Sequence, residues 1–416
     1  MNKKIAAVAV AGLFAAPVSA LAQSSVTISG VLKAGFENLK INNYNTGNPG
    51  GRPISSGKDS QYGVVDDSSR IIFNVREDLG GGLAAIGQMD IRLNPSDNNI
   101  GAAQNVSGTL AQGNSHVGLQ SSSWGRIFFG RQDLHYFNTS GNISGKNSLR
   151  ADSISLLAFA GAINTTGRST NGGTAIAGAT RTQNVVHYTT PNWGGFTGII
   201  AYSSNPGGNE TDIGNVATQS IRRGNAWNLN PNYAAANWQV GYSYWRSKPD
   251  SGMAVAVPTS STQFGGADQR AHRIYGDYTF GFGLKVGIAW DNSKLEGNTG
   301  VLDGTTLSKR TAWSIPMQYS FMGKHQITGH YTWAKDDSAS WLSGNNHSTG
   351  ANMWAIGYSY DLSKRTSVGL TYARINNQSN AGYNFFTSAG LGLGGTTGVM
   401  AGEDLRMFGT TLRHAF

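Results

Sequence analysis

The sequence predicts an all-β fold, a transmembrane barrel of sixteen antiparallel strands, and three observations support this. Segments of about ten residues alternate between apolar and polar positions and are separated by turn-rich stretches. Apolar residues make up only 39% of the chain, while glycine occupies 57 positions. Helical periodicity never persists, and no apolar run approaches the roughly 20 residues of a membrane-spanning helix. An apolar exterior around a polar lumen accounts for this balance.

The N-terminus has the pattern of a secretory signal peptide. A basic start at Lys3 and Lys4 precedes an apolar run over residues 5–16, and Ala20-Leu21-Ala22 supplies the small residues of a cleavage site. We therefore expect a signal peptide at residues 1–22, Sec export, and one barrel domain over residues 23–416. Loss of two lysines leaves 30 basic and 23 acidic residues, so the net charge falls from +9 to +7.

Composition narrows the function classes. An exported basic chain rarely has nucleic acid as its partner, so anionic solutes are the better candidates. The absence of cysteine excludes disulfides and thiolate metal sites. Scattered histidines and no recognisable Ser-His-Asp motif predict no enzyme, no cofactor and no metal, with calcium on loop carboxylates as the open alternative. The glycine run at residues 390–395 lacks a surrounding βαβ unit and is interpreted as a surface loop.

The first segment shows how the two faces of a strand separate. Its apolar parity comprises Val26, Ile28, Leu32, Ala34 and Phe36, and the other parity Thr27, Ser29, Val31, Lys33 and Gly35. Side chains alternate across a strand, so we assign the first set to lipid and the second to the lumen. The split recurs over residues 238–244, 284–291, 313–319 and 368–372, with aromatic residues near segment ends, as expected for interface girdles.

Connections alternate between short turns and long polar loops. The short turns are predicted at Asp78 to Leu83, Ser122 to Arg126, Pro191 to Gly195, Pro231 to Asn237, Phe280 to Gly283, Phe321 to His325 and Asp361 to Arg365. Seven turns and eight long loops connect sixteen strands, with both termini on the short-turn, periplasmic side. One loop, from about Leu134 to Thr182, has no convincing strand pair. Such a loop is either disordered or functional, and in a pore the functional option is to fold inward.

Short motifs occur in a characteristic order. They are Val26-Thr27-Ile28-Ser29-Gly30, Ser69-Arg70, Glu77-Asp78-Leu79-Gly80-Gly81-Gly82-Leu83, Gly125, Gly130-Arg131-Gln132, Tyr188, Pro191-Asn192-Trp193-Gly194-Gly195-Phe196, Leu362-Ser363-Lys364-Arg365-Thr366 and Leu412-Arg413-His414-Ala415-Phe416. Together, over essentially the whole mature chain, they resemble the general porins of Gram-negative bacteria, in particular those of β-proteobacteria. The resemblance implies an outer-membrane homotrimer in which each barrel is narrowed by its inward-folded third loop. Ions and small hydrophilic solutes would then diffuse passively through it.

The C-terminus also carries a family feature. Phe416 shares its parity with Leu412 and Phe408, which resembles the signal read by the barrel-assembly machinery. The alternative, that Phe416 belongs to the periplasmic aromatic girdle, is compatible with it. A barrel of this kind would also contact outer-membrane lipid and lipopolysaccharide.

The resemblance implies basic strand residues opposite acidic residues of the third loop. Carried over position by position, the basic residues are Arg70, Arg131, Arg181 and Lys33. Parity supports an inward direction for Lys33 and Arg70. The alternative is a purely structural role, in which each arginine pairs with a lumen carboxylate such as Asp90 or is a solvated charge at the rim.

Arg131 conflicts with parity, because it alternates with Ile127 and Phe129, which point it at lipid. A charge there costs about 2 to 4 kcal/mol at mid-bilayer. We follow the family and place Arg131 inward, with a bulge at Gly130 to redirect it.

Two departures from the family bear on selectivity. The fourth strand carries His116 where relatives commonly have another arginine, and an isolated inward histidine is more often a polar wall residue than a sensor. Between Leu134 and Thr182 the only acid is Asp152, against four basic residues. Fixed positive charge in a narrow passage attracts anions, so we expect moderate anion preference.

Two rival functions remain open. A substrate-selective channel with a saturable site, of the sugar or phosphate type, would need lumen aromatics, and Trp245 and Tyr275 are the obvious inward candidates. A non-conducting structural or adhesive barrel would have a plugged lumen.

Overall fold

The computed structural model describes residues 24–42, 60–93, 111, 113–136, 143, 145–147, 152–157, 181–204, 206, 224–248, 268–297, 303–339, 347–385, 399 and 402–416. The predicted signal peptide at residues 1–22 and the glycine run at 390–395 lie outside these residues. No helix in the described segments is long and apolar enough to cross a membrane.

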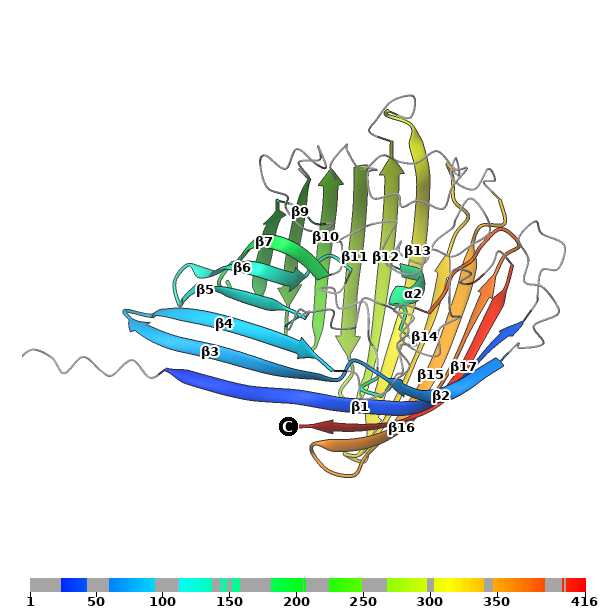
Figure 1. Cartoon of the computed structure of the whole chain (residues 1–416), viewed down its shortest axis with the longest axis horizontal. Coiled ribbons are helices and arrows are strands. Elements are labelled where there is room, and N and C mark those ends of the chain that lie inside the picture. Colours follow the sequence, from blue (N-terminus) through cyan, green and yellow to red (C-terminus); the bar gives the residue numbers. More distant parts are fainter. Residues whose placement is uncertain are drawn as a thin grey trace, which may run out of the picture.

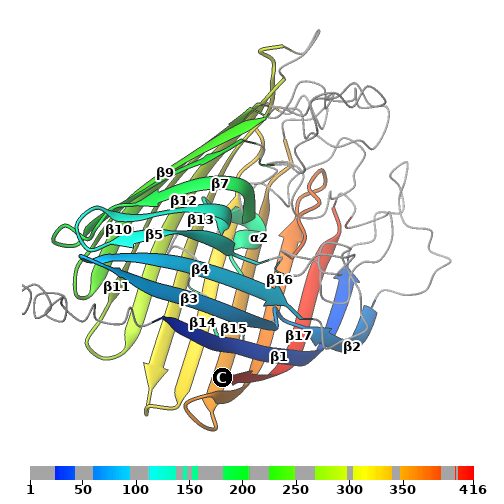
Figure 2. The same ribbon diagram turned by 60° about the vertical axis from the view of Figure 1, so that its left-hand side comes forward.

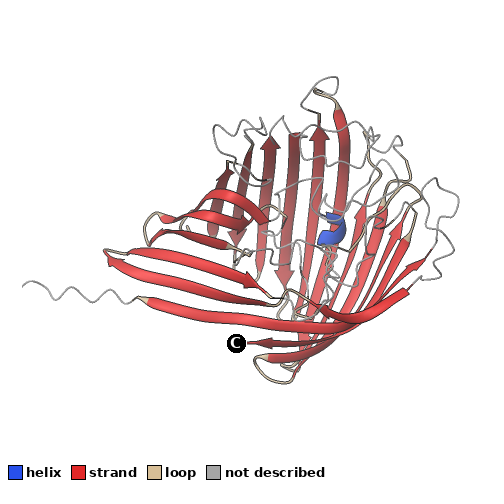
Figure 3. Ribbon diagram, viewed as in Figure 1, coloured by secondary structure: helices blue, strands red, loops and turns tan. Residues whose placement is uncertain are grey.

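The described chain is almost entirely β-strand (Figure 3). The strands are β1 (Ser25–Asn42), β2 (Ser60–Asp66), β3 (Arg70–Gly80), β4 (Leu83–Arg92), β5 (Ser115–Ser121), β6 (Gly125–Asp133), β7 (Arg181–Thr189), β8 (Phe196–Ser203), β9 (Asn225–Ala234), β10 (Trp238–Lys248), β11 (Asp268–Thr279), β12 (Leu284–Glu296), β13 (Thr306–Phe321), β14 (His325–Ala334), β15 (Ala351–Asp361), β16 (Thr366–Asn377) and β17 (Asp404–Ala415). One short helix, α2 (Ile154–Leu157), is described among them.

The strands close into a barrel (Figure 1). From β3 onward each strand pairs antiparallel with the next, and β17 pairs with β1. Both β2 and β3 pair with β1, so they form one interrupted wall strand. The seventeen segments therefore build the predicted sixteen-stranded antiparallel barrel, which has no free edge.

A local side-chain cap causes the interruption between β2 and β3. The Asp66 carboxylate accepts hydrogen bonds from the backbone N–H of Ser68 at 2.9 Å and of Ser69 at 3.1 Å. Ser68 has a φ of 69°, outside the strand region. Such a side-chain to backbone turn replaces ladder hydrogen bonds. The wall strand resumes at Arg70, which fixes the position of that side chain.

Six of the seven predicted turns lie where they were expected, between β3 and β4, β5 and β6, β7 and β8, β11 and β12, β13 and β14, and β15 and β16. The prediction at Pro231 to Asn237 began too early, because β9 continues to Ala234. Pro231 pairs with Gly198 of β8, and the pairing of β9 with β10 skips it. A proline without an N–H fits a strand at such an interruption.

The predicted faces are confirmed. Val26 and Ile28 are more than half exposed on the outside, as is expected for a surface that lipid covers, while Trp245 and Tyr275 are buried inside. On the outer surface, aromatic side chains of neighbouring strands adjoin one another, as in the series Trp290, Trp313 and Trp333.

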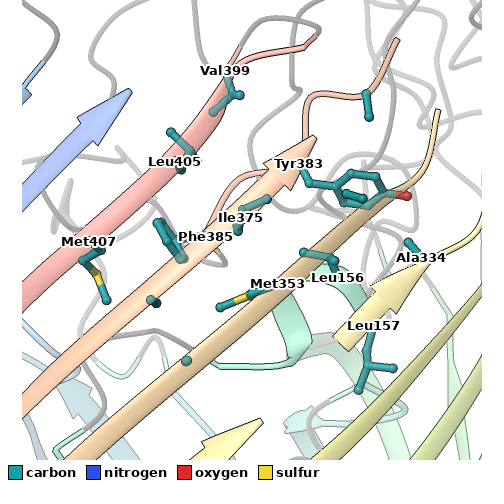
Figure 4. Packing of buried hydrophobic residues seen from close by; sticks show 14 of the residues in the cluster. Leu156, Leu157, Ala334, Met353, Ile375, Tyr383, Phe385, Val399, Leu405 and Met407 are labelled. Atoms are coloured by element: carbon teal, nitrogen blue, oxygen red, sulfur yellow. The ribbon is translucent and has the colours of Figure 1, made fainter. Parts of the chain in front are cut away.

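The lumen is polar only in part, which corrects the simple expectation of a polar interior. An apolar cluster covers the inner side of β13 to β17 and β1 toward the long-loop end. Figure 4 shows members of this cluster on the strands, among them Met353, Ile375, Leu405 and Met407, together with Leu156 and Leu157 of α2. Inward positions are apolar here because loop segments pack on them and exclude water.

Candidate functional site: the lumen and the third loop

The third loop, which joins β6 to β7, folds into the barrel. Its helix α2 is completely buried and contacts β13, β14 and β15. Figures 1 and 2 both show α2 within the ring of strands. The inward fold predicted from the length of the segment Leu134 to Thr182 is therefore confirmed.

The loop is clamped first at Tyr136. The Tyr136 hydroxyl lies 2.8 Å from the Ser293 hydroxyl, and Arg273 donates a 3.3 Å hydrogen bond to the Tyr136 carbonyl. The Arg273 guanidinium also lies 4.8 Å from the centre of the Tyr136 ring and 3.2 Å from the Asp291 carboxylate. All four side chains are buried, so β11 and β12 hold the start of the loop through a desolvated charged pair.

His135 completes this clamp. Its ring Nδ1 lies 2.9 Å from the Ser243 hydroxyl of β10, and its Nε2 lies 3.7 Å from the Asp291 carboxylate. Burial lowers the pKa of His135 to about 4, with Asp291 opposing that shift and Arg273 adding to it. The imidazole is therefore neutral at physiological pH, and the Arg273–Asp291 pair carries the charge.

Further along, the loop reaches the short-turn side of the barrel. Lys146 forms an ion pair with Asp361 at the end of β15. The Asn147 carbonyl accepts a 2.9 Å hydrogen bond from Thr371, and its side-chain oxygen accepts one of the same length from Ser367. The loop thus follows the inner wall across several strands.

The loop then turns back to α2. Asp152, the predicted loop acid, is half-buried just before the helix, where its carbonyl accepts a hydrogen bond from the Ser155 N–H at 3.0 Å. At the other end Arg310 donates a 2.8 Å hydrogen bond to the Leu157 carbonyl and a 3.3 Å bond to the Tyr383 hydroxyl. One buried arginine therefore joins the third loop to a segment of the last loop.

The arc of wall from β3 to β6 has a different character. Arg70 and Arg92 lie directly opposite each other on β3 and β4, with lumen-facing parity. Arg92 pairs with Asp90 at 2.8 Å. Like charges directly opposite each other destabilise a strand pair, so folding alone does not favour this arrangement.

Arg70 lies inside, as parity predicted. Within the part of the chain that the structure describes, its half-buried guanidinium makes no hydrogen bond or ion pair. Asp90, the carboxylate considered as its partner, pairs with Arg92 instead. Among the described residues, the Arg70 guanidinium therefore stays unpaired.

Arg131 and Arg181 come together at a register shift. Gly130 opposes Val185 and Gln132 opposes Thr182, so Arg131 faces two residues of β7. The predicted irregularity exists, but its extra residue belongs to β7 rather than to Gly130 of β6, which corrects that detail. The Arg131 and Arg181 charges are close enough to interact, and Arg181 pairs with Asp133 at 3.3 Å.

Lys33 and His116 lie in the barrel wall, and each side chain contacts another side chain of the wall. Lys33 forms an ion pair with Asp67 at the interruption between β2 and β3. His116 stacks on Phe128 with ring centroids 4.1 Å apart, and Phe128 stacks on His187 at 4.3 Å. These contacts fit the interpretation of His116 as a wall residue.

The structure adds Arg92 and Arg126, which sequence reasoning passed over. The Arg126 guanidinium lies 5.2 Å from the centre of the Phe128 ring, on the same arc as Arg70. Each shares parity with an inward residue, Arg92 with Asp90 and Arg126 with Phe128, and that signal was present in the sequence. We call Arg70, Arg92 and Arg126 the basic wall.

The C-terminal residues close the barrel. Phe416 exchanges two backbone hydrogen bonds with Gly30 of β1, at 3.0 and 3.1 Å. Its ring lies so close to Gly30 that a Cβ there would be 2.6 Å from it. Phe408 and Leu412 face outward and are exposed. Recognition of these residues by the assembly machinery stays a prediction.

Comparisons with known proteins agree with this architecture. A family model described as Gram-negative porin matches residues 6–380. An outer membrane porin protein of Bordetella pertussis is 26% identical over 391 residues, covering 88% of this chain and 92% of that protein. The major outer membrane protein P.IB of Neisseria meningitidis serogroup B is 24% identical and covers 95% of this chain and 98% of its own length.

Solved structures show the same fold. The anion-selective porin from Comamonas acidovorans superposes with a TM-score of 0.68 at 20% identity, covering 95% of this chain and 100% of that chain. The trimer form of OmpT of Vibrio cholerae gives a TM-score of 0.60 at 15% identity, with coverages of 94% and 99%. The family match over most of the sequence, on a closed barrel with an inward-folded loop, shows that the chain belongs to the Gram-negative porin family and is an outer-membrane channel protein rather than an enzyme.

Proposed function

We propose that the protein conducts ions and small hydrophilic solutes passively and favours anions. The observation that carries the proposal is the basic wall, whose Arg70 is unpaired among the described residues while the third loop is held on other strands. Fixed positive charge beside a narrow aqueous path raises the local concentration of anions and repels cations. Among the described acids near this wall, Asp90 and Asp133 have arginine partners, Asp67 pairs with Lys33, and Asp66 accepts hydrogen bonds from the backbone of Ser68 and Ser69.

A saturable sugar channel is less well supported. The two inward aromatics that could serve a sugar are withdrawn from the lumen, because Trp245 is fully buried and the Tyr275 hydroxyl is bound by Asn230 and Asn232. A stacking platform requires exposed ring faces. A non-conducting barrel is the other alternative, and a conductance measurement separates it directly.

We also propose a homotrimer, with lipopolysaccharide as a lipid partner and the barrel-assembly machinery as the folding partner. The trimer form of the Vibrio cholerae relative supports the first part. Cross-linking of the detergent-solubilised protein, followed by electrophoresis without heating, tests it. A band at the monomer position alone would contradict the trimer.

The selectivity experiment is a reversal-potential measurement in planar bilayers under a potassium chloride gradient. We expect the wild type to favour chloride. Arg70→Glu should lower the chloride-to-potassium permeability ratio by about twofold to fivefold, since one charge at 4 Å is worth about 1 kcal/mol in water. Lys309→Glu, a charge reversal on the outer face of β13, should change the ratio much less.

Each outcome of that measurement is decisive. Clear cation preference in the wild type would overturn the anion proposal, and equal effects of the two substitutions would show that net charge, not the basic wall, sets selectivity. Conductance that saturates with one solute would favour the selective channel. No conductance at all from folded protein would favour the structural barrel.

A further inference from the structure

Residues 143 and 145–147 of the third loop, which we call the strap, cross the inner wall of the barrel. Ile143 lies over Gly287 of β12, where an added Cβ would be 3.0 Å from the Ile143 side chain. Asn147 lies over Gly369 of β16, where an added Cβ would be 2.5 Å from the Asn147 Cβ. The wall thus has glycine under both ends of the strap, which makes room for it.

The strap keeps a constant height above the short turns. Gly287, Thr328 and Gly369, over which it lies, are each the fourth residue of a strand that begins at a short turn, namely β12, β14 and β16. At about 3.4 Å per residue this is about 10 Å along each strand. Arg310, which binds the Leu157 carbonyl of α2, is instead the fifth residue of β13 counted from its long-loop end. The third loop therefore covers the wall at two heights.

Asn147 is the firm attachment of the strap. Ser367 of β16 donates a 2.9 Å hydrogen bond to the Asn147 side-chain oxygen. Thr371 of β16 and Thr411 of β17 donate hydrogen bonds of 2.9 and 3.3 Å to the Asn147 carbonyl. All four side chains are buried, so water does not compete for these bonds.

Lys146 and Asp361 form the exposed attachment. Their ion pair joins the strap to the end of β15, across 215 positions of the sequence. Each side chain is 29% exposed, so water and dissolved ions reach the pair. An exposed pair of this kind contributes little to the stability of a fold. It does, however, determine how firmly the strap lies on the wall beyond Asn147.

We propose that the strap forms a second narrowing near the periplasmic end of the pore and that the Lys146–Asp361 pair is its latch. This inference rests on the proposed function of passive conduction. A segment that lies on the inner wall subtracts its own thickness from the open cross-section, so its release widens the path at that height. Because dissolved ions screen an exposed pair, the latch opens more readily as ionic strength rises.

The first test compares two single-charge variants of the full-length protein in planar bilayers. Asp361→Asn removes the latch. The control, Asp277→Asn, removes the same charge from the Asp277–Lys285 pair of β11 and β12, whose lysine is 30% exposed and which also lies close to a short turn. Unheated electrophoresis establishes that each variant is folded. Single-channel conductance is then measured at low and at high potassium chloride.

We expect Asp361→Asn to raise the single-channel conductance by roughly a quarter or more at low salt, and by less at high salt, where screening opens the wild-type latch as well. Larger polyethylene glycols added from the periplasmic side should also enter the Asp361→Asn pore. Asp277→Asn should leave both readouts near the wild-type values. Equal effects of the two substitutions would overturn the proposal, because they would reflect the lost charge and not the strap.

A disulfide provides a second test that does not depend on charge. The chain has no cysteine, so Asn147→Cys with Gly369→Cys creates a single possible pair. Their Cβ positions lie 2.5 Å apart and need to separate by only about 1 Å to reach disulfide geometry. Mass spectrometry of the oxidised protein should find this bond, and its absence would show that the strap does not lie on β16.

In this locked background, Asp361→Asn should raise conductance only after reduction with dithiothreitol. A rise that is already complete in the oxidised protein would overturn the assignment of the latch. A wild-type protein that folds but does not conduct would contradict the proposed function instead, while disulfide formation would still report where the strap lies.

Discussion

Two arcs of the inner wall differ in how they use the same inward positions. From β13 through β17 to β1, inward side chains are mostly small or apolar and are covered by α2 and loop residues such as Tyr383. From β3 to β6 they include Arg70, Arg92 and Arg126. The difference teaches that, among the described residues, the apolar cluster under the third loop lies on one arc of the lumen, while the other arc presents arginines.

The cause is burial. Leu156 and Leu157 of the third loop are completely buried against the apolar arc, and transfer of such side chains out of water stabilises the packed loop by about 1.5–3 kcal/mol each. Arg70 is half-buried on the other arc and remains accessible. The covered arc therefore holds the loop, and we expect the open arc to act on solutes.

If the seating of the third loop sets stability, the largest effect should come from the charged clamp on β11 and β12 that holds the start of the loop. Asp291→Asn removes the carboxylate that pairs with buried Arg273, and breaking such a pair costs about 3–5 kcal/mol. We expect a lower free energy of unfolding in a urea titration followed by tryptophan fluorescence. Unclamping the loop at Tyr136 should also make single-channel currents noisier.

The matched control is Asp277→Asn. Asp277 pairs with Lys285 at 3.1 Å on the same two strands, but that lysine is 30% exposed and Gln239 also donates a 2.7 Å hydrogen bond to the Asp277 carboxylate, so the loss should be smaller than for Asp291→Asn. Similar losses for the two substitutions would show that the clamp has no special role.

The next effect concerns the apolar seat of α2. Leu156→Ala leaves a cavity in the buried apolar cluster, and large-to-small substitutions in a packed core cost about 2–5 kcal/mol. Calorimetry of the detergent-solubilised protein should give a lower transition temperature, and mean conductance should rise as the loop loosens. Ile356→Ala, on the lipid-facing side of β15, serves as the control. A wild-type conductance together with wild-type stability in Leu156→Ala would refute the inner-core interpretation.

The sequence predicted the barrel and its strand faces because period-2 alternation depends on which side of the wall each residue faces. The same alternation predicted the inward direction of Arg70, whereas its choice as a site residue came from the resemblance to porins and stays a prediction. The sequence did not predict that Arg273 holds Tyr136 or that Arg310 contacts Leu157. In each of these contacts the two residues lie more than one hundred positions apart in the sequence. The register shift beside Arg131 arises from β7, so parity along β6 alone could not place its extra residue.

The smallest effect on stability should come from the open arc. Arg70→Gln removes a charge that makes no described hydrogen bond or ion pair, so the free energy of unfolding should change by less than about 0.5 kcal/mol. Arg92→Gln, directly across the strand pair, should cost several times more, because it leaves the buried Asp90 without its partner. In bilayers, however, Arg70→Gln should still reduce chloride preference. Two opposed arginines would then separate into one that supports the wall and one that acts on passing ions, whereas equal stability losses would assign both to the wall.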